Sequence, residues 1–284
     1  MLQCAFGDVL KPLLSIVLLI ACPLAAVGQT ATVQLKLLPQ DVIQRRLETV
    51  VGGTAARRAT LQSLFEEAGC HDERMVSQKV SMSRLPNLIC TMPGNDPGAG
   101  MIVAGAHFDY IGGGIGAVDD WSGVALLPSL YQSLAVRPRR HTFVFAGFSA
   151  EHQRLNGSYE FVYRLSKRQK RSVRAMMNLE SLGLTVPQVW ASRADKGLLD
   201  AYNSVARSMD LDVRVSNFSP LMEDDSRPFL DSRIPVITIH SLTNETMGFH
   251  HSPKDQLNAI DGKNYYDAYR LAAVFLAYLD DLPN

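Results

Sequence analysis

Met101-Ile-Val-Ala-Gly-Ala106 is a short apolar run, and the residue that follows it is His107. Two further apolar runs, at 142–150 and 173–179, are followed in the same way by Glu151 and Glu180. Runs of this length that are mainly apolar are typical of strands buried on both faces, as in a parallel sheet. Three side chains that can bind a metal therefore lie just past three predicted strands, which is where α/β enzymes keep their chemistry.

The composition favours one large folded domain. The chain has 284 residues, of which 46% are hydrophobic and 20% are charged, so it can bury a substantial core. Lys plus Arg and Asp plus Glu number 28 each, and this balance gives no overall field that would attract nucleic acid. We expect a single catalytic domain over residues 29–284, with no nucleic-acid partner.

Outward from the opening run, apolar periodicity alternates between strand and helix. This alternation predicts an α/β fold, with a mixed, largely parallel central sheet and helices on both faces, arranged in three layers. Strands are predicted at 76–82, 87–92, 101–106, 142–148, 173–179, 187–191 and 234–240. Helices are predicted at 40–50, 54–68, 122–135, 157–169, 195–209 and 262–281.

The N-terminal residues 1–28 have the pattern of a secretory signal peptide. An apolar segment at 13–21 is too short to span a bilayer and is followed by small residues, so cleavage is expected near Ala26 or Gly28. The alternative is a lipoprotein anchored through Cys22, because residues 19–22 resemble a lipidation box. The protein is thus expected to be secreted or periplasmic, without a membrane span.

Export affects how the cysteines are interpreted. Removal of the signal peptide leaves Cys70 and Cys90, which are separated by 20 residues. An oxidising compartment favours a disulfide between them over two free thiols. Neither cysteine is near the His and acidic positions in the sequence, which argues against a thiol metal site.

Two motifs add candidates to the site. Asp119 comes twelve residues after His107, in Gly116-Ala-Val-Asp-Asp-Trp-Ser-Gly123. Helix capping explains one acid there better than two, and a carboxylate is suited to bridge two cations. Glu151 is followed by His152, so that one could coordinate a cation while the other acts as general base. An exposed Glu-His pair in a surface loop is the alternative.

The third motif is Phe249-His-His-Ser-Pro-Lys-Asp255, which comes after the strand predicted at 234–240. Adjacent histidines cannot easily reach the same cation, so one would be a ligand and the other could polarise the substrate. Taken alone, an exposed His-His pair in a loop is the alternative. The glycines at 112–116 do not match a dinucleotide fingerprint and predict an active-site loop instead.

In this order, the motifs resemble those of the zinc aminopeptidases of the M28 peptidase family, from about residue 35 to the C-terminus. They are Ala106-His-Phe-Asp109, Gly116-Ala-Val-Asp-Asp-Trp-Ser-Gly123, Ala150-Glu-His-Gln-Arg-Leu-Asn-Gly-Ser158, Asn178-Leu-Glu180 and His251-Ser-Pro253. The resemblance implies two zinc ions, with cobalt or manganese as alternatives. Asp119 would bridge the ions, His107 and Glu180 would bind one, and His152 and His251 the other. Glu151 would be the general base.

The chain also departs from the family pattern. His152 stands where the family usually has Glu, and Glu180 where it usually has Asp; both replacements can bind zinc. Asp225, in Asp224-Asp-Ser-Arg-Pro-Phe229, matches a family segment, and His250 stands where Tyr is frequent. These last two residues are candidates for contact with the substrate.

The resemblance implies an exported aminopeptidase that acts on peptides with a free N-terminus, through metal-assisted hydrolysis of the amide bond. One alternative is a glutaminyl cyclase, which shares the scaffold in a related family and uses a single zinc. Another is a non-catalytic relative that binds a metal or a peptide. The number of bound ions and the activity would distinguish the three.

Overall fold

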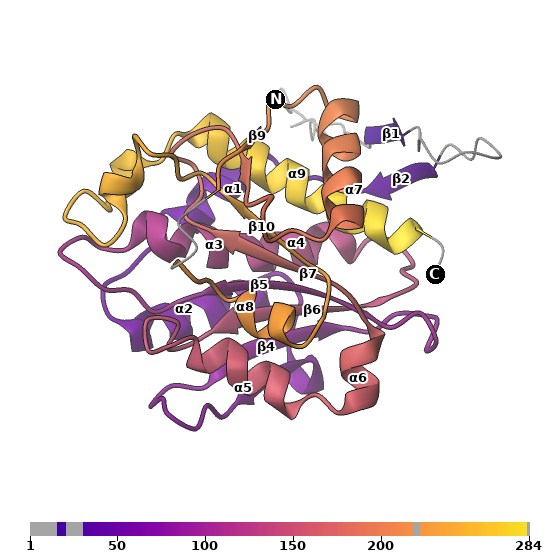
Figure 1. Ribbon diagram of the computed structural model, residues 1–284, viewed down its shortest axis with the longest axis horizontal. Coiled ribbons are helices and arrows are strands. Elements are labelled where there is room, and N and C mark those ends of the chain that lie inside the picture. Colours follow the sequence, from indigo (N-terminus) through magenta and orange to yellow (C-terminus); the bar gives the residue numbers. More distant parts are fainter. Residues whose placement is uncertain (1–15, 21–30, 218–221, 283–284) are drawn as a thin grey trace, which may run out of the picture.

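The computed structural model describes residues 16–20, 31–217 and 222–282. Within them, an eight-stranded sheet runs through the middle of the molecule in the order β3-β4-β6-β5-β7-β10-β8-β9 (Figure 1). The four central strands β6, β5, β7 and β10 are mutually parallel, whereas β3 and β4 are antiparallel to their neighbours. The strands are β3 (Met75–Gln78), β4 (Asn87–Met92), β5 (Met101–His107), β6 (Thr142–Phe148), β7 (Val173–Glu180), β8 (Gln188–Val189), β9 (Arg214–Val215) and β10 (Val236–His240).

Helices cover both faces of this sheet, as the three-layer prediction requires (Figure 1). On one face lie α1 (Gln40–Leu47), α2 (Thr54–Glu67), α3 (Ser122–Val124), α4 (Leu126–Leu134), α7 (Lys196–Ser208) and α9 (Gly262–Asp281). On the other lie α5 (Asn156–Arg164), α6 (Lys167–Ser172) and α8 (Arg227–Asp231). The short helical turns are η1 (Asp72–Arg74), η2 (Ala117–Trp121), η3 (Met247–Phe249) and η4 (Leu257–Ala259).

Successive residues of β5 enter different cores, because side chains alternate across a strand. Ile102 and Ala104 belong to the larger core beneath α4 and α9. Val103 belongs to the smaller core, where it shares a cluster with Phe161 of α5 and Phe229 of α8. Burial on both faces explains why these central strands appear in the sequence as unbroken apolar runs.

Several predicted boundaries were wrong, and three of the differences have local reasons. The helix predicted at 157–169 is two helices, since Ser166 forms a capping box with Gln169 and starts α6. The strand predicted at 76–82 ends at Gln78, which pairs with Asn87, the first residue of β4. The strand predicted at 234–240 begins only at Val236, after a proline that has no N–H to donate. Strand β9 and helix α8 were not predicted.

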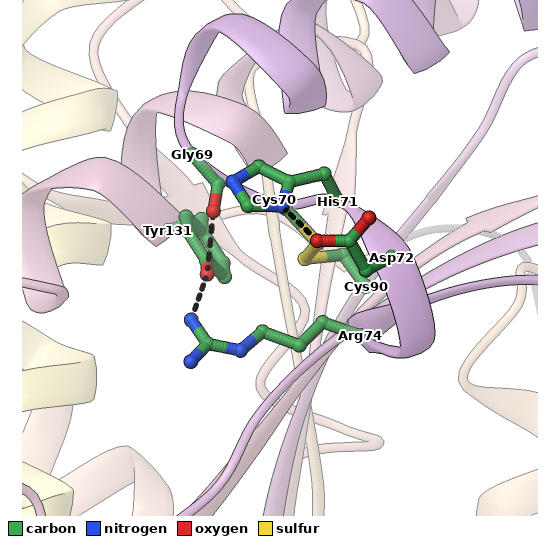
Figure 2. Close-up of a disulfide and its surroundings, with 7 residues drawn as sticks. All are labelled: Gly69, Cys70, His71, Asp72, Arg74, Cys90 and Tyr131. Atoms are coloured by element: carbon green, nitrogen blue, oxygen red, sulfur yellow. Dashed lines mark hydrogen bonds and ion pairs between the residues drawn. A yellow bond between two sulfur atoms is a disulfide. The ribbon is translucent and has the colours of Figure 1, made fainter.

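Cys70 and Cys90 form a disulfide, as predicted from their pairing and spacing. It joins the turn after α2 to strand β4, and both residues are fully buried (Figure 2). Beside it, the Tyr131 hydroxyl donates to the Gly69 carbonyl and accepts from Arg74. The disulfide therefore fastens α2 to an antiparallel part of the sheet.

The N-terminal segment is described only in part. Strand β1 (Ile16–Ile20), within the apolar segment 13–21, pairs antiparallel with β2 (Ala31–Leu35). The expected cleavage site near Ala26 or Gly28, and Cys22, lie outside the described residues. Among the helices that are described, none is both long and apolar enough to cross a membrane.

Candidate functional site

The predicted ligands come together at the carboxyl ends of the parallel strands. His107 is the last residue of β5 and Glu180 the last of β7, and these neighbouring strands run in the same direction. Both side chains line a cavity of about 210 Å³. Asp119, His152 and His251 line the same cavity. Since the five ligands come from well-separated segments of the chain, it is the topology of the sheet that brings them together.

Asp119 lies at the centre of this cluster and is almost fully buried. Its Oδ1 is 3.1 Å from Nε2 of His107, and its Oδ2 is 3.0 Å from Nε2 of His251. Yet neither oxygen accepts a hydrogen bond of good geometry from the described residues. Burial opposes ionisation, but the imidazoles of His107 and His251 outweigh it and lower the pKa of Asp119. A buried, ionised carboxylate with two unsatisfied oxygens is a fitting metal ligand.

The rest of the donor set also fits a metal. Nε2 of His107 is 3.8 Å from Oε1 of Glu180. The ring of His152 lies edge-on to the rings of His107 and His251, with centroids 5.1 and 4.8 Å away. Nε2 of His152 is buried and has no hydrogen-bond partner among the described residues. Ligand atoms of Asp119, His152 and His251 lie within 4.8 Å of one another, and this nitrogen and oxygen set suits zinc and similar divalent ions.

Glu151, the predicted general base, lies next to these ligands, and one of its oxygens lies within 4.8 Å of ligand atoms of His107 and His152. Its Oε2 is 2.6 Å from Nδ1 of His152, and its side chain is mostly buried. Burial raises the pKa of Glu151 to about 8, and the nearby carboxylates of Glu180 and Asp119 add to this effect, while His107 opposes it. A carboxylate whose pKa is raised towards neutrality can both take and return a proton.

Three buried carboxylates hold the backbone of the site, and of their contacts the sequence predicted only helix capping by one of the adjacent acids at 119 and 120. Asp109 accepts from the N–H groups of Glu151 (3.1 Å) and His152 (3.3 Å). Asp120, next to the predicted bridging residue, accepts from the N–H groups of His107, Gly123 and Ser181, at 3.3, 3.0 and 3.1 Å. Each of the two carboxylates thus ties together backbone segments that carry predicted ligands.

Asp255 is the third of these carboxylates. It accepts from the N–H groups of Val118 at 2.6 Å and Asp119 at 3.2 Å. It comes four residues after His251 and is separated from Asp119 by 136 positions. The bond therefore links the loop that carries one predicted ligand directly to the residue expected to bridge the ions.

The glycines at 112–116 let this loop approach closely. Gly112 has φ of 97°, and a Cβ placed on it would lie 2.7 Å from the carbonyl oxygen of His251. A Cβ on Gly114 would lie 2.4 Å from the carbonyl oxygen of Asp255. The stretch predicted to be an active-site loop thus packs, backbone against backbone, on the segment that carries His251.

The two candidates for substrate contact lie in different places. His250 lines the cavity, with its ring stacked on that of His251 and Nδ1 3.2 Å from Oδ2 of Asp119. Asp225 is fully buried and is not among the residues that line the cavity. Its neighbour Asp224 does line it, with its oxygens engaged by Thr238 and Ser226. The contact predicted for Asp225 stays a prediction.

The remaining walls are apolar, apart from one acid. Trp190, Met222 and Leu242 line the cavity together with the ligands, and Glu223 lies at its rim. Glu223 is 45% exposed and forms an ion pair with Arg227 at 3.0 Å. None of these four residues was predicted as part of the site. Met222, Glu223 and Leu242 come from loops without a periodic signal, and Trp190 lies in the strand predicted at 187–191, where nothing marked it as a cavity wall.

Relatives share both the sequence pattern and the fold. A probable zinc metalloprotease of Pyrenophora tritici-repentis is 28% identical over 175 residues, covering 54% of this chain and 38% of that protein. The Legionella pneumophila LapA aminopeptidase superposes with a TM-score of 0.71 at 17% identity, covering 90% of this chain and 79% of LapA. An Acidobacteriales bacterium glutaminyl cyclase superposes with a TM-score of 0.68 at 19% identity, covering 85% and 93%.

The chain spans between 34% and 38% of the length of the curated relatives that it matches. The structural similarities, at under 25% identity, establish the fold. The family itself is shown by the sequence model of "Peptidase family M28", which matches residues 87–276. This match takes in every predicted metal ligand and well over half of the chain, and on this evidence the chain belongs to peptidase family M28.

Proposed function

We propose that this chain is an exported, metal-dependent aminopeptidase that removes N-terminal residues from peptides. The observation that carries the proposal is the unsatisfied carboxylate of Asp119, enclosed by imidazoles, with Glu151 next to the cluster. His107, Asp119 and Glu180 would hold one zinc ion, and Asp119, His152 and His251 a second. When bound, the ions would supply Lewis acidity to a water molecule and to the substrate carbonyl.

Glu151 would carry the proton in this reaction. Its carboxylate accepts a proton from the attacking water and returns it to the leaving amine. One side chain thus acts first as general base and then as general acid. Asp109 holds the backbone N–H groups of Glu151 and His152, which fixes the base relative to the ligands. His250, at the cavity wall, would donate to the substrate carbonyl oxygen.

The shape of the cavity supports exopeptidase specificity. A volume of about 210 Å³ between Trp190, Met222 and Leu242 suits one side chain of the substrate and favours an apolar one. The exposed carboxylate of Glu223 at the rim can pair with a free N-terminal ammonium group. Similarity to relatives named as metalloproteases and aminopeptidases supports the same assignment.

The test is Glu151→Gln, assayed on aminoacyl p-nitroanilides with bound metal measured in parallel. We expect kcat to fall about 100- to 10,000-fold, the usual contribution of a general base, while the metal content is unchanged. Glu245→Gln, in an exposed turn where the side chain accepts from Thr243, is the matched control and should retain full turnover. Full turnover by Glu151→Gln with metal still bound would contradict the role of Glu151.

A cyclase that uses one ion is the second candidate. The group Asp119, His152 and His251 could hold a single ion without the other ligands, and this observation favours it. Elemental analysis of the purified protein, combined with assays for pyroglutamate formation and for peptide hydrolysis, separates the two. Two ions with hydrolysis support the aminopeptidase, one ion with pyroglutamate formation supports the cyclase, and neither ion nor turnover indicates a binding protein.

Export rests on the sequence of residues 1–28 alone. N-terminal sequencing and mass measurement of the mature protein would distinguish cleavage near Ala26 or Gly28 from lipidation at Cys22.

A further inference from the structure

A second cavity lies next to the first. Its volume is about 420 Å³, twice that of the cavity that holds the metal ligands. His152 lines both cavities, so the two meet at the predicted catalytic centre. Buried Asp109, Ser149 and Ala150 contribute to the lining of the second cavity.

The reaction gives the two cavities different occupants. Glu151 must reach the leaving nitrogen to return the proton, so the peptide beyond the scissile bond has to leave the first cavity past Glu151 and His152. The second cavity is next to that path, because His152 lines both cavities. The first cavity is left with the N-terminal side chain, between Trp190 and Leu242.

The rim of the second cavity has a distinct chemistry. Met82 is 75% exposed and Ile111 is 47% exposed, an unusual degree of exposure for large apolar side chains that line one hollow. Arg84 lies in the same lining and is the one Lys or Arg among the described residues of this cavity. Its side chain is exposed and pairs with no described carboxylate. The oxygens of Asp109 are already engaged by backbone N–H groups.

We propose that the second cavity binds the leaving-group part of the peptide, with Met82 and Ile111 contacting an apolar side chain and Arg84 pairing with a substrate carboxylate. This inference rests on the proposed aminopeptidase function and adds selection at the second residue of the substrate. The carboxylate is either the C-terminus of a short peptide or an acidic side chain, since a guanidinium recognises both in the same way.

The experiment compares substrates that share one N-terminal residue, chosen as the best p-nitroanilide. They are the anilide, a dipeptide ending in Leu with a free carboxylate, the same dipeptide as its amide, and the dipeptide amide ending in Glu. Arg84→Gln should raise KM about two- to fivefold for substrates that carry a carboxylate, the range for an exposed ion pair, with kcat unchanged. KM for the anilide and for the Leu amide should stay the same.

Arg168→Gln provides the matched control. Arg168 is an exposed residue of α6, which leads into the start of β7, whereas the site lies at the end of that strand. Arg168→Gln removes the same charge at the opposite end of the strands, and it should leave KM unchanged for every substrate. If Arg84→Gln raises KM for the free dipeptide alone, the group bound by Arg84 is a C-terminal carboxylate. If it raises KM for the Glu amide, that group is an acidic side chain.

Two failures can be told apart. If the anilide is hydrolysed but Arg84→Gln changes KM equally for the free dipeptide, its amide and the Glu amide, or changes KM for none of them, the cavity proposal is overturned and the aminopeptidase function stands. If no substrate is hydrolysed, the proposed function fails. Calorimetric binding of the free dipeptide, its amide and the Glu amide to metal-loaded Glu151→Gln then tests the cavity separately. Equal affinities for all three, unaffected by adding Arg84→Gln, would overturn the cavity proposal as well.

Discussion

Asp255→Asn should destabilise the fold and loosen the metal site together. The carboxylate accepts from two backbone N–H groups, those of Val118 and Asp119, whereas an amide offers one acceptor oxygen and turns an NH₂ group towards the second N–H. Losing one bond to a charged acceptor costs about 1.5–3 kcal/mol. Burial raises the pKa of Asp255, so the neutral amide recovers part of that loss. We therefore expect the free energy of unfolding to fall by about 2 kcal/mol.

Urea unfolding, together with metal titration of the chelated protein, measures both effects. Displacing the backbone of Asp119 should weaken metal binding roughly 10- to 100-fold, as for other residues that orient ligands. Asp261→Asn is the matched control, because Asp261 caps α9 by accepting from one N–H group, a role that Asn fills equally well. If Asp255→Asn matched the control in both stability and metal affinity, the hydrogen bonds from Val118 and Asp119 to Asp255 would not have the structural role given to them here.

Two further predictions concern the fold away from the site. Replacing Cys70 and Cys90 by Ser should lower the free energy of unfolding by about 3 kcal/mol, the chain-entropy value for a closed loop of this size, with kcat retained; urea unfolding checks this, and unchanged stability would contradict it. Burial would raise the pKa of Asp280, but bonds from His141 and Arg140 outweigh it and lower the pKa below 3.8. Its stabilising contribution is therefore present above about pH 4 and is lost as the pH falls further. The stability difference between wild type and Asp280→Asn should shrink below that pH in acid-dependent unfolding curves, and a constant difference would argue against the linkage.

The elements that could be predicted are those with a strong local signal. The strands at 87–92 and 142–148 and the helix at 262–281 were predicted with the bounds that the structure shows, because unbroken apolar runs or a long helical periodicity mark them. The helix at 157–169 failed because the competing capping box at Ser166 outweighed the continuing pattern. Strand β9 and helix α8 have too few residues to produce any period.

The predicted ligands lie around one cavity because two of them end strands and the others lie in loops or a short helical turn next to the strand ends. The sequence does not reveal the carboxylates that hold the backbone around these ligands. The bond from Asp255 to Asp119 crosses 136 positions, and no local pattern encodes it. Asp109 is different: it lies two positions after His107, and alternation places such residues on the same side, so its proximity to the site could have been inferred.

The clamps formed by Asp109, Asp120 and Asp255 also bear on how the protein is prepared. They fasten main-chain amides to carboxylates outside the proposed ligand set, so the chelated protein should keep the shape of the metal-loaded protein. One divalent ion could then be exchanged for another without any change in the backbone of the site. Crystals grown without metal would accept ions by soaking, and ion preference could be compared on a single unchanging scaffold.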